Sequence, residues 1–423
     1  MLLQAHSRRC FLLGLLLSLA THNAVADSPL QRPSGLSAGI PAAGDDFQSY
    51  LERNQQRLRD VLSRDYFAAD PHPFGAGYDL DTVVDYRGPY EFRPPQNCQG
   101  AGTGMGFMLT HGLTDTPYLL RDVAASLREH YPCALLRGLL LPGHSTVPGD
   151  TLQMRHEDWL SVTEFGVNSF RGEVEALYLV GFSTGTSLSV RYMDAHRDDA
   201  LIKGLIMLSP AIQAKSGLAF LSPYLRWFSD WLGEGDEHDF ARYESFSVNA
   251  GAEFYLLTRD LSKKNFAALT VPVFMAGSGD DATVDMNMAA NFFCDKTPKG
   301  KGRMLWYKAE ATGSAPERSC EGLLVVAAAS PAHRVINFSH TSLSIAPENP
   351  HYGLDGDYPV CDAYQAEPEL FAQCKDDGAQ TVYGERGLGE QGRYQGKLVR
   401  RGTFNPHYAQ MIEHMVGFIQ SID

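Results

Sequence analysis

The stretch Tyr178-Leu179-Val180-Gly181-Phe182-Ser183-Thr184-Gly185 decides the fold of this 423-residue chain. Its first three residues are apolar and predict a buried strand, and the pattern over 187–195 predicts a helix. Between them, the last five residues fit the spacing G-x-S-x-G. The two glycines allow a sharp strand-to-helix turn that lifts a serine hydroxyl clear of the sheet. The sequence therefore predicts Ser183 as a nucleophile.

The pattern on both sides of this turn repeats. Apolar runs that predict strands lie at 107–110, 134–136, 176–180, 205–208, 271–276, 304–308 and 335–338, and helical patterns lie at 45–64, 118–130, 159–170 and 407–422. The stretch 82–92 has the β-branched and aromatic content of strands. Strands that alternate with helices predict an α/β fold, with a mainly parallel sheet covered on both faces.

Two backbone N–H groups are candidates for an oxyanion hole, which stabilises the negative oxygen formed when a carbonyl is attacked. One belongs to Thr184, directly after the nucleophile. The other belongs to Leu113, in the loop after the strand at 107–110, where Gly112 permits a tight turn. His111 in the same loop is interpreted as structural, with no role in proton transfer.

A serine nucleophile needs a base that is held by a carboxylate, and in this kind of fold the chain order is Ser, then Asp or Glu, then His. Asp281 follows the strand at 271–276 and is the predicted acid, with its neighbour Asp280 as the alternative. Asp285 is expected to cap the next helix. His340 follows the run at 335–338 and is the predicted base.

Taken in order, these motifs resemble the carboxylesterase and monoacylglycerol-lipase branch of the α/β-hydrolases, also grouped with the serine aminopeptidase-like hydrolases. The matching residues are His111-Gly112-Leu113-Thr114-Asp115, Leu141-Pro142-Gly143-His144, Trp159, Gly181-Phe182-Ser183-Thr184-Gly185, Asp281 and His340. The resemblance implies an eight-stranded sheet, a cap after the sixth strand, no cofactor, and ester hydrolysis through an acyl-enzyme. It covers the chain from residue 107 to about 284, together with the loop at His340.

The rest of the chain departs from that pattern. The first hundred residues have no clear counterpart, and 296–330 looks like an insertion. A cap is expected at about 211–270, where an aromatic stretch predicts a lid over an acyl pocket, an ordinary packed helix pair, or both. A long insertion is expected at about 341–403, near the mouth of the site because it begins beside His340. The catalytic domain as a whole is expected to span 45–423, after a flexible leader at 27–44.

Residues 1–26 have the order of a secretory signal peptide. Arg8 and Arg9 precede an apolar run, and small residues lead up to the expected cleavage after Ala26. The paired arginines also fit a twin-arginine signal, so the sequence leaves open the Sec and twin-arginine routes. The apolar run is too short to span a bilayer. An exported protein, periplasmic or secreted, is expected.

Six cysteines remain after the predicted cleavage, and an even count in an exported protein permits disulfides. The expected pairs are Cys294–Cys320 and Cys361–Cys374, with Cys98–Cys133 as a weaker prediction. No zinc-type spacing of cysteines is present in the sequence, so no metal site is predicted.

The amino-acid composition reduces the number of functions to be considered. Aspartate plus glutamate exceeds lysine plus arginine to give a formal charge of −14, which makes nucleic acid an unlikely partner. The predicted substrate is a small-molecule or lipid ester, with transient lipid contact through the cap. Two alternatives stay open: a peptidase or amidase that uses the same triad, and an inactive hydrolase fold that serves as a binding protein.

Overall fold

The computed structural model describes residues 28–309, 315–376, 380–387 and 392–422. The predicted signal peptide, residues 1–26, lies outside the described residues. Within the stretch predicted as a leader, a short helical turn, η1 (Pro29–Gln31), precedes Ser34. The Ser34 backbone N–H and hydroxyl both donate to the Asp150 carboxylate, at 2.7 and 2.8 Å. This part of the expected leader is therefore hydrogen-bonded to the body of the fold.

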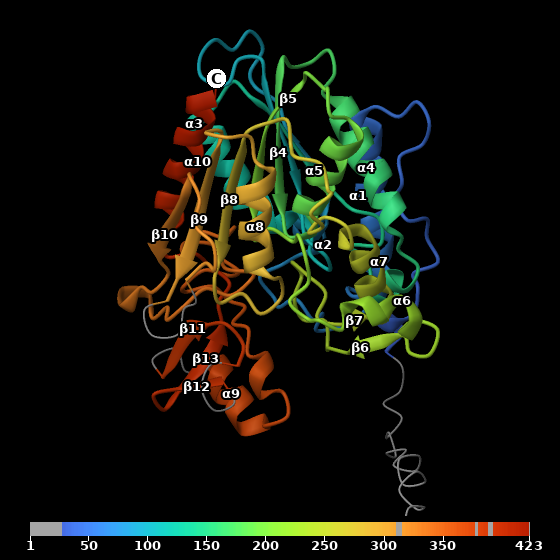
Figure 1. Cartoon of the computed structure of the whole chain (residues 1–423). Helices are drawn as coiled ribbons and strands as arrows, with labels where there is room; N and C mark the ends of the chain where they lie inside the picture. The colour runs from blue at the N-terminus through green and yellow to red at the C-terminus, as the bar shows by residue number, and fades with distance from the viewer. Residues whose placement is uncertain (1–27, 310–314, 377–379, 388–391, 423) are drawn as a thin grey trace, which may run out of the picture.

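A large sheet runs through the centre of the molecule (Figure 1). Its eight strands have the order β1-β3-β2-β4-β5-β8-β9-β10. They are β1 (Tyr90–Phe92), β2 (Met105–Thr110), β3 (Leu135–Leu139), β4 (Ala176–Phe182), β5 (Ile202–Leu208), β8 (Val273–Ser278), β9 (Gly302–Lys308) and β10 (Leu323–Ala327). Only β1 pairs in the antiparallel sense, so the described sheet is mainly parallel, as predicted.

Helices cover both faces of this sheet and bury two apolar cores. The helices are α1 (Phe47–Asp65), α2 (Leu80–Arg87), α3 (Arg121–His130), α4 (His156–Ser169), α5 (Thr184–Ala195), α8 (Met286–Lys296) and α10 (Tyr408–Ile422). Helices α2, α3 and α10 pack into one core, α4, α5 and α8 into the other, and α1 contributes to both. With a serine at the sharp turn after β4, this architecture is the α/β-hydrolase fold, so the predicted fold class is confirmed.

Two of the predicted strands are wrong. Residues 80–87 form α2, because the Asp79 side chain caps the Thr82 N–H and Val83 and Val84 are buried on one side of the helix. Residues 335–338 are a loop in which only Val335 makes isolated bridges. The sheet edge is instead taken by β10, which pairs with β9. The segment 296–330, predicted as an insertion, thus supplies two strands of the sheet.

Two segments interrupt the alternation of strands and helices. Segment 211–270 contains η4 (Ala219–Leu221), α6 (Ser222–Leu225), β6 (Trp231–Gly233), β7 (Phe246–Ser247) and α7 (Val248–Thr258). Segment 341–403 contains η6 (Asp362–Tyr364), α9 (Pro368–Asp376), β11 (Thr381–Gly384), β12 (Arg393–Tyr394) and β13 (Lys397–Arg401). Figure 1 shows them at the lower end of the sheet, on opposite sides.

The first of these segments follows the fifth strand of the sheet, whereas the resemblance implied the sixth. The difference arises because the chain contributes only β1 to the sheet before β2. Helices α1 and α2, of 19 and 8 residues, are the main elements ahead of β1. The extra strand β10 at the opposite edge keeps the sheet at eight strands.

Three disulfides are present among the described residues, Cys98–Cys133, Cys294–Cys320 and Cys361–Cys374. They are the three pairs that the sequence predicted. Disulfides of this kind are typical of proteins in an oxidising compartment. Across the described residues, no helix combines the length and the apolar content that crossing a membrane requires.

Candidate active site

Ser183 lies at the sharp turn between β4 and α5. Its backbone has φ 50° and ψ −116°, a left-handed conformation that is strained for a residue with a side chain. The chain packs so tightly here that a Cβ on Gly181 would lie 2.5 Å from Thr186 N. A Cβ on Gly185 would lie 2.0 Å from Thr110 O. Both glycines of G-x-S-x-G are therefore required by close approach of the backbone.

The structure brings Ser183, His340 and Asp281 into one hydrogen-bonded row. Ser183 Oγ lies 2.9 Å from His340 Nε2, and His340 Nδ1 lies 2.7 Å from Asp281 Oδ2. All three residues are buried, with at most 7 % of any of them exposed. In the tautomer that this geometry favours, Nδ1–H donates to the carboxylate and Nε2 accepts the serine proton.

The neighbouring aspartates have different surroundings. The second carboxylate oxygen of Asp281 accepts hydrogen bonds from the N–H groups of Thr283 and Val284, at 2.7 and 2.9 Å. Asp280 does not reach His340, and burial raises the pKa of its carboxyl. Asp285 caps α8, as predicted, by accepting from two N–H groups of the first turn. Of the two candidate acids, Asp281 is the one in contact with the histidine.

Glu385, which the sequence analysis missed, ties the two loops of this row together. Its Oε2 accepts hydrogen bonds from the backbone N–H of His340 and of Ala282, at 3.1 and 3.2 Å. The side chain is buried, and Arg401 Nε lies 3.4 Å from its other oxygen. Because Glu385 is 45 residues beyond His340 in the chain, no local pattern indicates the contact.

The two predicted oxyanion N–H groups are not engaged elsewhere. Among the described residues, no acceptor is found for the N–H of Leu113 or of Thr184. The loop that carries Leu113 lies against the nucleophile, since a Cβ on Gly112 would be 3.0 Å from Ser183 Cβ. Both N–H groups are therefore free to donate to an oxygen bound beside Ser183.

His111 holds this loop in place, in agreement with its structural interpretation. Its Nε2 accepts a hydrogen bond from Leu141 N at 3.1 Å, and Nδ1 lies 2.8 Å from Gly112 O. Burial and the neighbouring His144 lower the pKa of His111 well below its ordinary value. The ring is therefore neutral near pH 7 and serves to join the loops after β2 and β3.

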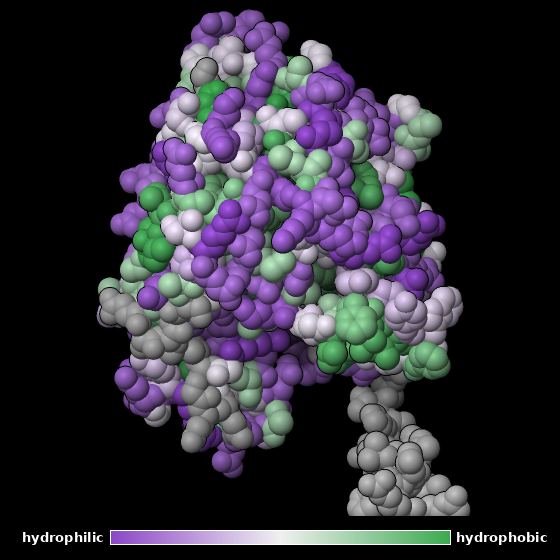
Figure 2. Space-filling view, viewed as in Figure 1, coloured by the Kyte–Doolittle hydropathy of each residue, from purple (hydrophilic) through white to green (hydrophobic). Residues whose placement is uncertain are grey.

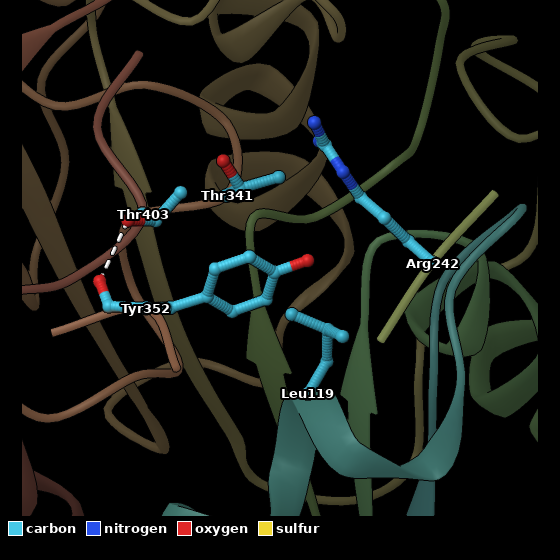
Figure 3. A pocket seen from close by; sticks show the side chains of 5 residues that line it. All are labelled: Leu119, Arg242, Thr341, Tyr352 and Thr403. Atoms are coloured by element: carbon cyan, nitrogen blue, oxygen red, sulfur yellow. Dashed lines mark hydrogen bonds between the residues drawn. The ribbon is translucent and has the colours of Figure 1, made fainter. Parts of the chain in front are cut away.

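A narrow hollow, with no room for a water molecule, lies where segments 211–270 and 341–403 meet the rest of the fold. Figure 3 shows its lining, with Leu119 below the Tyr352 ring and the Tyr352 hydroxyl turned toward the side on which Arg242 lies. Thr341, the residue after His340, and Thr403 complete it. The Thr403 hydroxyl donates to Tyr352 O at 2.7 Å. Segment 341–403 therefore supplies three of the five residues that line this hollow.

One further group of side chains has ligand atoms as close together as those of a metal site. The ligand atoms of His156, Glu157 and Glu253 lie within 4.8 Å of one another. However, Glu253 is already paired with His156 at 2.5 Å and with Arg226 at 2.7 Å. The cluster is therefore an ion-pair network that joins α4, α7 and the turn after α6.

Comparison with known proteins gives limited similarity. No family model matches this chain. A thermostable monoacylglycerol lipase of Bacillus sp. (strain H-257) is 29 % identical over 109 residues, which are 26 % of this chain and 41 % of that protein. The matched stretch thus covers less than half of that lipase.

Solved structures with similar folds include several lipases. A monoglyceride lipase of Saccharomyces cerevisiae has a TM-score of 0.41 and 16 % identity over 52 % of this chain and 81 % of its own. The monoacylglycerol lipase of Paleococcus ferrophilus has a TM-score of 0.40 and 16 % identity over 52 % and 87 %. Est1E of Butyrivibrio proteoclasticus, solved with ferulic acid, has a TM-score of 0.38 and 19 % identity over 52 % and 84 %.

Proposed function

We propose that this chain is a serine hydrolase that cleaves carboxylic esters, of the carboxylesterase or lipase type, through an acyl-enzyme. The observation that carries the proposal is the hydrogen-bonded row from Ser183 through His340 to Asp281. The free N–H groups of Leu113 and Thr184 support it, because acyl transfer needs donors for the oxyanion. The partial similarity to a monoacylglycerol lipase also favours ester substrates.

The proposed mechanism needs no cofactor. His340 Nε2 takes the hydroxyl proton as Ser183 Oγ attacks the ester carbonyl carbon, while Asp281 stabilises the imidazolium through Nδ1–H. Leu113 and Thr184 donate their N–H groups to the oxyanion. His340 then gives the proton to the leaving alkoxide, and the alcohol departs from the acyl-enzyme. A water molecule, deprotonated by His340, attacks the acyl carbon and releases the acid and free Ser183.

The strained backbone at Ser183 has a role in this scheme. Ser183 lies at the N-terminus of α5, and its φ of 50° turns the hydroxyl away from the line of β4 and toward His340. Partial positive charge at a helix N-terminus favours the negative charge that develops on the attacked carbonyl. Packing of the two glycines against β2 and α5 holds this conformation in place.

The decisive test is hydrolysis of p-nitrophenyl esters of increasing acyl length by the mature protein and by Ser183→Ala. We expect turnover to fall by roughly 10⁴- to 10⁶-fold in the variant, because the nucleophile is lost. Ser161→Ala removes an exposed hydroxyl on α4 and is the matched control. A folded Ser183→Ala protein with near-normal turnover would contradict the proposal.

The same experiment separates the alternatives. Hydrolysis of short aminoacyl amides in preference to all esters would indicate a peptidase or amidase with the same triad. Failure of a phosphonate probe to label Ser183 in the folded protein would indicate an inactive hydrolase fold that binds a partner. The acyl length that gives the highest turnover would distinguish a small-ester carboxylesterase from a lipid hydrolase.

We also propose that segment 211–270 is a cap that contacts lipid and that the protein is exported to the periplasm or secreted. Figure 2 shows an apolar patch on the side where Figure 1 places α6, β6 and β7. Its members are Leu218, Phe220, Tyr224, Leu225, Trp227, Phe228 and Leu232, all of which are exposed. The three disulfides support export.

A further inference from the structure

Asp115 lies beside the predicted nucleophile, in the loop that carries Leu113. A Cβ placed on Gly112 would be 2.3 Å from Asp115 Oδ2 and 3.0 Å from Ser183 Cβ. The carboxylate is therefore within a few ångströms of the serine side chain. Only 5 % of Asp115 is exposed. The proposed mechanism gives this residue no task.

The carboxylate of Asp115 has no protein partner. Across the residues that the structure describes, no hydrogen bond or ion pair to it is found. Asp281 and Asp239, the other deeply buried aspartates near the site, each accept from several groups. An unpaired buried carboxylate is costly, because it loses its hydration without a replacement. Burial accordingly raises the pKa of Asp115 to about 7.

Charges of both signs surround Asp115. Its backbone forms a bridge with that of Arg242, and the guanidinium groups of Arg242 and Arg401 act to lower its pKa, whereas the carboxylate of Asp239 acts to raise it. None of these side chains donates to it. The Arg242 guanidinium is directed instead to Asp239, at 3.3 Å. A substrate ammonium would be repelled by these cations, whereas an uncharged hydroxyl would not.

We propose that Asp115 binds the substrate, by accepting a hydrogen bond from a hydroxyl group one or two carbons from the scissile ester. The proposal rests on the proposed ester hydrolase function and names the chemical class of its substrate, a hydroxyl-bearing ester. The missing partner of the carboxylate would then be supplied by the substrate. A site built to bond a hydroxyl discriminates strongly against the analogue that lacks it, since its own polar group is left unpaired.

The test compares two esters of equal size, 2-hydroxyethyl butyrate and propyl butyrate. We expect the wild-type protein to prefer the hydroxylated ester by about 10- to 100-fold in kcat/KM, mainly through KM. Asp115→Ala should bring the preference to near unity while turnover of propyl butyrate persists. Asp115→Asn, which keeps the shape and one acceptor oxygen, should retain part of the preference.

The pH dependence gives a second readout that a structural role would not change. An ionised carboxylate is the stronger acceptor, so the wild-type preference should increase as the pH rises through about 7. In Asp115→Asn it should not vary with pH. Asp122→Asn is the matched control, because this half-buried carboxylate accepts hydrogen bonds from Ala346 N and Asn349 away from the nucleophile. The variant should change the hydrolysis of both esters alike.

Three results would overturn the proposal. One is an equal preference in the wild-type and Asp115→Ala proteins, and another is the absence of any preference in the wild-type protein. The third is a stronger preference for 2-(dimethylamino)ethyl butyrate, which is an ammonium donor at neutral pH. By contrast, a wild-type protein that hydrolyses no ester at all would contradict the ester hydrolase function itself, on which this proposal depends.

Discussion

Segments 211–270 and 341–403 flank the same end of the sheet but differ in construction. The first carries an exposed aromatic surface, with Trp227 and Phe228 exposed to 77 % and 88 %. The second has a small sheet of β11, β13 and β12, a disulfide and buried polar side chains. Exposed apolar surface is typical of a contact site, whereas a network of buried hydrogen bonds favours one conformation. We infer that segment 341–403 holds the catalytic residues in position and that segment 211–270 is the part that contacts lipid, as proposed above.

The two segments are joined to each other. Buried His351, from segment 341–403, lies 3.0 Å from an oxygen of Asp239 in segment 211–270 and 2.9 Å from an oxygen of Asp357. The hydroxyl of Tyr352 donates to the other oxygen of Asp239. Tyr358 donates to Glu244 at 2.5 Å. The following predictions test how far this division of roles between the segments holds.

The largest expected effect is on stability, from the disulfide of segment 341–403. Changing both Cys361 and Cys374 to Ser should lower the free energy of unfolding by about 3 kcal/mol, because the bond no longer restricts the unfolded chain. Urea denaturation measures the loss. Hydrogen exchange should rise in β11 and β13. Removing Cys98–Cys133 is the control, and similar exchange in both variants would argue that 341–403 is not a separate structural unit.

The next effect is on catalysis, through Glu385. Glu385→Gln should lower kcat by about 10- to 100-fold, since the loops of His340 and Asp281 lose a shared charged acceptor. KM should change less. Steady-state kinetics on a short p-nitrophenyl ester measures both constants. Glu369→Gln, at an exposed position on α9, should leave both unchanged. If kcat is also unchanged in Glu385→Gln, the segment does not position the site.

A smaller effect depends on pH and concerns the link between the segments. Burial alone would lower the pKa of His351, but its hydrogen bonds to Asp239 and Asp357 outweigh burial and raise the pKa above the ordinary value. The resulting stabilisation is complete below about pH 6.5 and is lost as the pH rises through the raised pKa. Tyr78, which donates to Asp357, and Arg242 also face these carboxylates.

His351→Gln should therefore be less stable than the wild-type protein by about 1 kcal/mol for each hydrogen bond lost. The difference in Tm should be greatest near pH 6 and should shrink as the pH increases. Thermal melts from pH 6 to pH 9 measure it. A difference that stays constant over this range would mean that the imidazolium charge does not hold the segments together.

The smallest effect on folding is expected at the apolar patch. The double change Trp227→Ser and Phe228→Ser should alter the free energy of unfolding by no more than about 0.5 kcal/mol, because both side chains are already exposed. Binding to neutral lipid vesicles should fall, while hydrolysis of a short soluble ester should not. Val325→Ser removes exposed apolar surface on β10 and serves as control. Unchanged vesicle binding would refute the proposed lipid contact.

Several expectations from the sequence agree with the structure because they depend on local pattern. The apolar run, the two glycines and the helix that follows them predict the turn at Ser183 from consecutive residues. The capping role of Asp285 is equally local. The aromatic stretch is compatible with both of its interpretations, since α6 packs against α7 while several of its large side chains are exposed. The stretch 82–92 was predicted correctly only in part. Residues 90–92 form β1, whereas 82–87 are helical because an aspartate cap outweighed β-branched content.

The sequence by itself determined the class of fold, the nucleophile candidate and the order in which its partners follow. These features depend on short stretches of consecutive residues, in which the spacing of apolar residues and the positions of glycines determine the backbone conformation. Only the tertiary structure decided that Asp281 and not Asp280 meets His340, that Glu385 holds both of their loops, and that Asp115 is buried without a partner. Such contacts join residues far apart in the chain, and the packing of the whole sheet determines which of them meet.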